Sequence, residues 1–140
     1  MKRFTGIISL ILFSALLTPA SGGREECFVC GMWIDQYMST RHEVRLNHGI
    51  SRSFCSLACT ARFRDDHLEE IGEIRAADYL SHSLTDAERA YYLEGSDIPG
   101  VMSHTSRLAF SRKEEAERFR KKHGGRVISF KEALRNQLGG

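Results

Sequence analysis

The sequence predicts an α+β fold, with two consecutive ββαβ-like units packed as one compact domain and a short C-terminal helix. The stretch 41–55 alternates apolar and polar residues around Asn47-His48-Gly49, which is typical of two strands joined by a turn. A helical stretch and a further alternating stretch follow it. The same order of strand, strand, helix and strand then recurs, which places the approximate halves at 27–80 and 85–138 within a domain spanning 21–140.

In the first half, Ser56 is the expected cap of a helix that runs through "LACTARFRDDHLEE". If this helix begins near Cys55, then Cys55, Cys59 and Phe63 fall on one face of it. The alternating stretch 71–80 is then expected to form a strand that completes the first unit.

The second half is expected to place strands at 89–95 and 107–110 around a loop at 96–106. A helix capped by Thr85 and Glu88 is the alternative for the first of these stretches. Two further capping boxes predict helices, one opening at Ser111-x-x-Glu114 and ending at Gly124-Gly125, the other opening at Ser129-x-x-Glu132 and stopping at Gly139. The stretch "RVISF" between them is a short predicted strand.

Residues 1–20 have the layout of a secretory signal peptide. Lys2 and Arg3 precede an apolar run from Ile7 to Leu17, and cleavage is expected after Ala20, with Gly22 or Gly23 as the alternatives. The run is shorter than the roughly 20 residues that span a membrane. We therefore expect a periplasmic or otherwise secreted protein that is soluble after cleavage, with a retained amino-terminal anchor as the alternative.

The charge of the chain argues against nucleic-acid binding. The whole sequence carries 20 Lys and Arg against 18 Asp and Glu. Cleavage after Ala20 would remove two basic residues and no acidic ones, which leaves a neutral body with no concentrated basic field. No nucleic-acid partner is therefore expected.

The four cysteines form two closely spaced pairs, Cys27/Cys30 and Cys55/Cys59. Each spacing lets both sulfurs point at one atom, and a hairpin between the pairs can bring them together. Four thiolates suit Zn(II) or Cu(I). In an exported chain, two disulfides are the alternative, and the sequence does not choose among the three connectivities.

Methionine and histidine residues favour copper over zinc. Met32 follows the first cysteine pair, and Met102 lies in a loop with His104 two residues later. Thioethers bind Cu(I) well and zinc poorly. Met38 is expected to be a core or surface residue, and His42, His48 and His82 are expected to face solvent.

Catalysis is not expected. A redox role for the CxxC motif requires its first cysteine at a helix amino terminus in a βαβ setting, and "GMWIDQY" after Cys30 offers no such cap. The sequence also contains no HExxH, GxSxG or nucleotide-binding glycine loop.

Four segments together resemble the NosL family, the accessory copper proteins of nitrous-oxide reductase, and its NosL-like relatives. They are "CFVCGM", the FCSxxCxxxF stretch at 54–63, "AYYLEGSDIPGVMS" and "AFSRKEEAERFRKKHGG". The resemblance implies two similar ββαβ units and an exported Cu(I)-binding protein. It also implies that Cys30, Met32 and Met102 occupy the family's ligand positions, with Cys27 as the first cysteine of the motif.

This chain departs from the family pattern in two respects. Typical members carry a lipid-attachment cysteine, and no cysteine precedes Cys27 here. Many members lack the Cys55/Cys59 pair, so service to nitrous-oxide reductase itself is in question.

The expected function is that of a copper chaperone delivering metal to a periplasmic enzyme or copper-transport protein. The expected metal site draws on Cys27, Cys30, Met32, Cys55, Cys59, Met102 and His104, with Cu(I) as the preferred ion and Zn(II) as the alternative. A disulfide- or zinc-stapled binding module without metal transfer is the alternative function.

Overall fold

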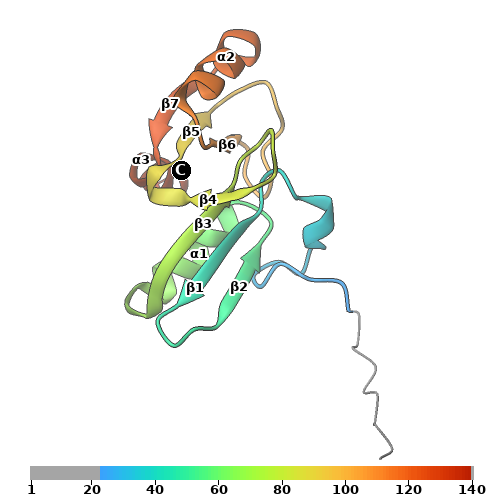
Figure 1. Cartoon of the computed structure of the whole chain (residues 1–140), viewed down its shortest axis with the longest axis vertical. Helices are drawn as coiled ribbons and strands as arrows, with labels where there is room; N and C mark the ends of the chain where they lie inside the picture. Colours follow the sequence, from blue (N-terminus) through green and yellow to red (C-terminus); the bar gives the residue numbers. More distant parts are fainter. Residues whose placement is uncertain (1–22, 140) are drawn as a thin grey trace, which may run out of the picture.

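The computed structural model describes residues 23–139, in which two antiparallel sheets and three α-helices pack together (Figure 1). The first sheet has the order β2-β1-β3-β4, formed by β1 His42–Leu46, β2 Ser51–Phe54, β3 Ile71–Ala77 and β4 Leu84–Asp86. The second has the order β6-β5-β7, formed by β5 Tyr91–Glu94, β6 Arg107–Phe110 and β7 Arg126–Ser129. The helices are α1 Leu57–Asp66, α2 Lys113–His123 and α3 Phe130–Leu138. This arrangement confirms the predicted α+β fold with two ββαβ units and a C-terminal helix.

The helix boundaries confirm some of the predicted caps and correct others. The Ser129 hydroxyl accepts a hydrogen bond from the Glu132 backbone N–H at 3.2 Å, and α3 ends at Gly139 as predicted. The predicted capping box at Ser111 is wrong, since α2 is preceded by Arg112 without a side-chain cap. Ser111 instead donates its hydroxyl and backbone N–H to the buried Asp78 carboxylate, at 2.9 and 2.7 Å. The Ser111 side chain therefore joins two parts of the fold rather than starting a helix.

The first sheet is larger than predicted and its third strand is shorter. β3 ends at Ala77 rather than continuing to residue 80, because Asp78 begins a turn in which its carboxylate accepts from Leu80 N and Ser81 N. After this turn the chain forms β4, an edge strand that the sequence did not predict, antiparallel to β3. Asp86 then caps a 3₁₀ turn, Ala87–Arg89, so the alternative helix at this point is also wrong.

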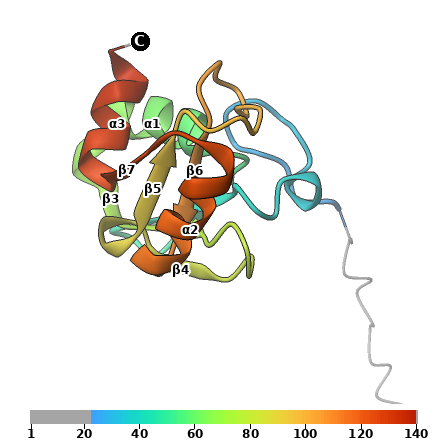
Figure 2. The ribbon, with the colours of Figure 1, turned by 90° about the horizontal axis from the view of Figure 1, so that it is seen from above.

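One hydrophobic core joins the two units. Figure 2 shows α1 of the first unit beside α3 at the end of the second, and the two helices pack against each other. Phe54, Tyr92 and Phe130 are the largest fully buried side chains in this core, and the Tyr92 and Phe130 ring centroids lie 5.6 Å apart. A smaller cluster under α2 contains Leu93, Leu108, Phe110 and Ala116. The shared core fixes the relative position of the two units.

Within residues 23–139, no helix is both long and apolar enough to cross a bilayer.

His42 lies in this core, although the sequence analysis expected it to face solvent. Its side chain is buried in β1, where one ring nitrogen, Nδ1, lies 3.0 Å from the Thr40 carbonyl oxygen. The other, Nε2, lies 3.0 Å from the Tyr92 hydroxyl. Nδ1 must donate to the carbonyl, and in the neutral imidazole Nε2 then accepts from the Tyr92 hydroxyl. Burial lowers the pKa of His42 to about 4.

This burial predicts a loss of stability in acid. Because the pKa of His42 is about 4 when folded and near 6.5 when unfolded, its contribution is complete above pH 6.5 and disappears as pH falls toward 4. The free energy of unfolding should drop by about 3 kcal/mol over this interval from His42 alone. Urea unfolding at several pH values measures the slope. The His42→Gln variant should lose this part of the slope, whereas His48→Gln, at an exposed position, should retain it; equal slopes in all three proteins would contradict the assignment.

Candidate metal centre

A tight loop holds the first cysteine pair. The Gly31 N–H donates to the Cys27 carbonyl at 2.9 Å, and the Cys27 N–H donates to the Met32 carbonyl at 2.8 Å. Gly31 has a φ of 74°, a conformation that glycine adopts without steric cost. The loop therefore turns back on itself, and the Cys27 and Cys30 side chains come from its two sides.

Hydrogen bonds attach this loop to the second cysteine pair. The Phe28 N–H donates to the Ser53 carbonyl of β2 at 2.9 Å, two residues before Cys55. Cys55 follows β2 directly, and Cys59 lies in the first turns of α1. Cys55 thus precedes the helix instead of starting it, but the strand-to-helix turn still brings its sulfur to 3.7 Å from that of Cys59.

The four cysteines form one cluster. Their Sγ atoms all lie within 4.8 Å of one another, and Cys30 Sγ lies 3.6 Å from Cys55 Sγ. All four are free thiols; Cys27, Cys55 and Cys59 are buried and Cys30 is partly exposed. Four sulfurs bound tetrahedrally at about 2.3 Å from a metal would be separated by about 3.8 Å. The cluster therefore already has nearly the spacing of a four-sulfur metal site.

The thiols of the cluster differ in acidity. Hydrogen bonding from Cys59, supported by Cys30, lowers the pKa of Cys55 to about 6 in spite of its burial. Burial is the main cause that raises the pKa of Cys30 to about 11. The pKa of Cys59 is raised even more, mainly by its hydrogen bond with Cys55 and then by burial. Near neutral pH the cluster therefore holds a thiolate at Cys55, and a metal that binds all four sulfurs must displace protons from Cys30 and Cys59.

The loop that carries Met102 lies beside the cysteine segments. Figures 1 and 2 both show the 96–106 loop next to the chain around residues 25–40. Val101 packs against the core that contains the cysteines, and a small crevice is bordered by Gly100 and Val101 on one side and by Thr40 and Ser56 on the other. The second unit therefore folds back over the first at the level of the cysteine cluster.

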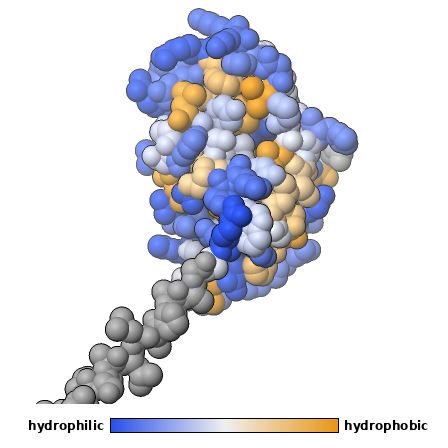
Figure 3. Space-filling model, turned by 90° about the vertical axis from the view of Figure 1, so that its right-hand side faces the viewer, coloured by the Kyte–Doolittle hydropathy of each residue, from blue (hydrophilic) through white to orange (hydrophobic). Residues whose placement is uncertain are grey.

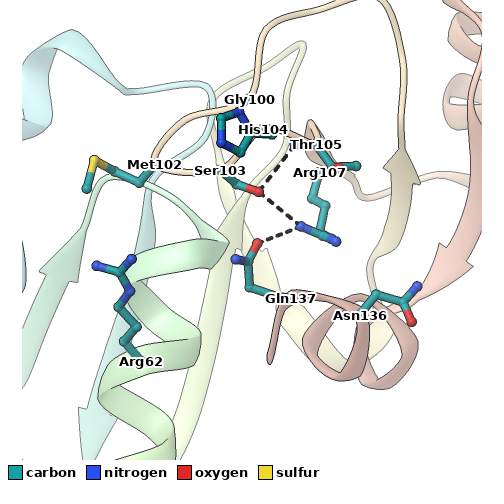
Figure 4. Close-up of a pocket in the computed structure, with 9 residues that line it drawn as sticks. All are labelled: Arg62, Gly100, Met102, Ser103, His104, Thr105, Arg107, Asn136 and Gln137. Atoms are coloured by element: carbon teal, nitrogen blue, oxygen red, sulfur yellow. Dashed lines mark hydrogen bonds between the residues drawn. The ribbon is translucent and has the colours of Figure 1, made fainter. Parts of the chain in front are cut away.

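The remaining predicted ligands occupy different positions. Met32 is partly buried against the main core, as is Met38. Met102 is exposed and has a φ of 55°, a left-handed conformation uncommon for residues other than glycine. Met102 is one of the residues that line the cavity beside its loop, and its thioether points away from the His104 ring (Figure 4). His104 is exposed at that cavity. The structure thus brings the four cysteines together, whereas the thioethers and His104 remain predicted ligands.

A family model described as NosL matches residues 20–138. The chain belongs to the NosL family. A crystal structure of the copper chaperone NosL from Shewanella denitrificans superposes with a TM-score of 0.68 and 27% sequence identity, over 77% of this chain and 88% of that one. The fold and the predicted family resemblance are both confirmed by these matches.

Two characterised proteins are also similar in sequence. The copper-binding lipoprotein NosL of Stutzerimonas stutzeri is 29% identical over 121 residues, which cover 77% of this chain and 61% of that protein. The HTH-type transcriptional repressor CutR of Bacillus subtilis (strain 168) is 26% identical over 112 residues, covering 80% of this chain and 58% of that protein. This NosL-family chain therefore spans about three fifths of the length of these two relatives.

Sequence reasoning missed two residues that support the cluster. The Thr40 hydroxyl donates to the Cys55 carbonyl at 2.8 Å and fixes the turn between β2 and α1. The Ser56 hydroxyl, predicted as a helix cap, makes no capping bond and lies 3.8 Å from Cys55 Sγ, where it can donate to the thiolate. No spacing rule indicates Thr40; for Ser56, its place directly after a cysteine was the available signal.

Proposed function

We propose that this NosL-family protein is an exported Cu(I)-binding protein that delivers copper to a client metalloenzyme or copper-transport protein. The observation that carries the proposal is the cluster of four free thiols with all Sγ atoms within 4.8 Å. The relatives support copper as the metal, since two of them are described as a copper-binding lipoprotein and a copper chaperone. In this proposal the protein catalyses no reaction.

Thiolate and thioether ligands together favour Cu(I) over Zn(II). Four thiolates alone accept both ions, whereas thioethers bind Cu(I) and contribute little to zinc. Met32 lies next to the cysteine loop in sequence, and the Met102 loop contacts the segments that flank the cluster. A zinc-stapled or disulfide-stapled module without metal transfer is the alternative function, in which these methionines have no ligand role.

Exposure suggests how metal enters and leaves the cluster. Cys30 is partly exposed whereas the other three cysteines are buried, so Cys30 is the sulfur that an incoming ligand reaches first. Two neighbours of the loop cysteines, Phe28 and Val29, have 55% and 37% of their surface exposed. On the face of the protein that carries residues 25–40, apolar side chains appear in several places among polar ones (Figure 3). The proposed transfer to a client takes place at this partly apolar face.

Metal competition tests the proposed function. The reduced protein, prepared without oxygen, is offered Cu(I) and Zn(II) together with a chelator of known affinity for each ion. We expect Cu(I) to bind far more tightly than Zn(II). Equal affinities, or a preference for zinc, would favour the stapled module.

The same assay tests the role of Met102. The Met102→Leu variant keeps the side-chain volume, so the thermal midpoint of the metal-free protein should hardly change. We expect weaker Cu(I) binding at pH 7, and a larger loss at pH 5, where thiolates are scarcer and the thioether carries no proton. Met38→Leu is the matched control and should bind copper like the parent. Parent-like affinity of Met102→Leu at both pH values would assign the site to the cysteines alone.

A further inference from the structure

A cavity of about 540 Å³ lies beside the 100–105 loop, and both Met102 and His104 of this loop line it (Figure 4). Its walls come from four parts of the fold: α1 with Arg62, the loop with His104, the start of β6 with Arg107, and α3 with Gln137. A volume of this size is in the range of pockets that hold small organic ligands. The predicted metal site does not use Arg62, Arg107 or Gln137, whereas its candidate ligands Met102 and His104 also line the cavity.

The cavity wall contains basic side chains and, among the described residues, no acidic ones. Two arginines and a histidine are among the nine described residues that line it, and none of the nine is acidic. Arg62 is exposed and forms no ion pair within residues 23–139, although Asp65 and Asp66 lie one turn further along the same helix. The cavity therefore presents a cation that the described part of the protein leaves uncompensated.

Hydrogen bonds fix the side chains of Arg107 and Gln137 at the cavity and leave a donor of Gln137 free within residues 23–139. The Arg107 Nη1 donates to Gln137 Oε1 at 2.6 Å and to Ser103 Oγ at 3.3 Å, and its Nε donates to Glu94 at 2.8 Å. Because Gln137 uses its oxygen for Arg107, its Nε2 amide group is left without a hydrogen-bond partner among the described residues. The side chain of Arg107 is 8% exposed and cannot turn away without breaking these bonds.

The shape of the cavity depends on a tight turn. A Cβ on Gly100 would come within 2.1 Å of the Ser103 carbonyl oxygen and 2.9 Å of that of Thr105. The loop therefore folds closely on itself, and this fixes Ser103 and His104 at the cavity wall. Preorganised donors of this kind lose little entropy when a ligand binds.

We propose that this cavity binds a small organic anion with one or more carboxylate groups. The Arg62 guanidinium can bind a carboxylate through two parallel N–H bonds, and the Gln137 amide and the His104 ring can donate to a second oxygen. A single inorganic oxyanion would leave much of the cavity unfilled. The anion site draws on Arg62 and Gln137, which the copper site does not use; Met102 and His104 line the cavity and are also candidate copper ligands.

Citrate is a suitable probe for the metal-free, reduced protein. A titration followed by ¹⁵N–¹H NMR, at constant ionic strength with chloride, should show saturable shifts at Arg62, in the 100–107 loop and at residues 136–137. The Arg62→Gln variant should bind citrate about tenfold more weakly or worse, as expected for the loss of a charge-assisted pair. Arg118→Gln makes the same charge change at an exposed position on α2 that does not line the cavity, and it should bind like the parent.

A second variant and a second anion complete the test. Gln137→Glu places a carboxylate beside Arg107 and in the cavity, so citrate binding should disappear while the fold persists. Non-saturable shifts with citrate, or an equal effect of Arg62→Gln and Arg118→Gln, would overturn the proposal. Sulfate binding at the same residues with the affinity of citrate would overturn the assignment to organic carboxylates. Because no metal is present, the result does not depend on the proposed copper function.

Discussion

Replacing Cys55 with serine should weaken Cu(I) binding by at least about 100-fold. Cys55 lies within 3.7 Å of two other cluster sulfurs, and its pKa of about 6 makes it the thiolate of the cluster at neutral pH. Structural zinc sites with four ligands bind with about 10–16 kcal/mol, and on that scale the loss of one ligand corresponds to about 3 kcal/mol, or about 100-fold. Chelator competition at pH 7 on the reduced protein measures the loss.

The fold should survive this substitution, which separates a ligand from a core residue. Serine has nearly the shape of cysteine, so the thermal midpoint of the metal-free variant should stay close to that of the parent. Ser56→Ala is the control, since it removes a buried hydroxyl 3.8 Å from Cys55 Sγ but no sulfur. A Cys55→Ser protein that binds Cu(I) as tightly as Ser56→Ala would exclude Cys55 from the site.

Glu94→Gln should cost about 3–5 kcal/mol of unfolding free energy, the usual loss when one partner of a buried ion pair is removed. The Glu94 carboxylate is buried at 8% exposure and accepts from Arg107 at 2.8 Å, from Arg126 at 2.8 Å and from Asn136 at 3.0 Å. Burial alone would raise the pKa of Glu94, but these three donors lower it overall. The variant leaves Arg107 buried without its counter-charge, so denaturant unfolding at pH 7 should show the full loss.

Glu132→Gln is the matched control for Glu94→Gln. Glu132 also pairs with Arg126, at 3.2 Å, but the Arg126 side chain is 60% exposed and the pair is screened by water. Its loss should change the unfolding free energy by less than about 1 kcal/mol. Similar losses in both variants would contradict a special role for Glu94 in joining β5, β6, β7 and α3.

The sequence was sufficient to predict the order of the two ββαβ units, without β4, and the convergence of the two cysteine pairs, with disulfides as the open alternative. Both predictions rest on residues close together in the sequence. The alternation of apolar and polar residues around Asn47-His48-Gly49 predicted the hairpin, and the two short cysteine spacings predicted two pairs that this hairpin could bring together. The register of β1 and β2, with His42 opposite Phe54, places Cys55 at the base of the hairpin where the first pair is attached. The signal peptide predicted at residues 1–20 lies outside the described residues.

What the sequence could not predict depends on contacts between distant segments. His42 is polar and lies in a hairpin strand, and its burial depends on the Tyr92 hydroxyl, fifty positions away, as well as on the nearby Thr40 carbonyl. Ser111 matches a capping box, but the Asp78 carboxylate competes for its hydroxyl and backbone N–H. The donors of the anion cavity, Arg62 and Gln137, come together only because α1 packs against α3.

X-ray absorption at the copper edge, on anaerobically loaded protein, is the most direct test of the four-cysteine copper site. The proposed site predicts a Cu(I) spectrum whose first shell is made of three or four sulfur atoms, which the close spacing of the four thiols allows without rearrangement. The same spectrum of Cys55→Ser should lose sulfur scatterers. A first shell dominated by nitrogen or oxygen in the parent protein would contradict the account.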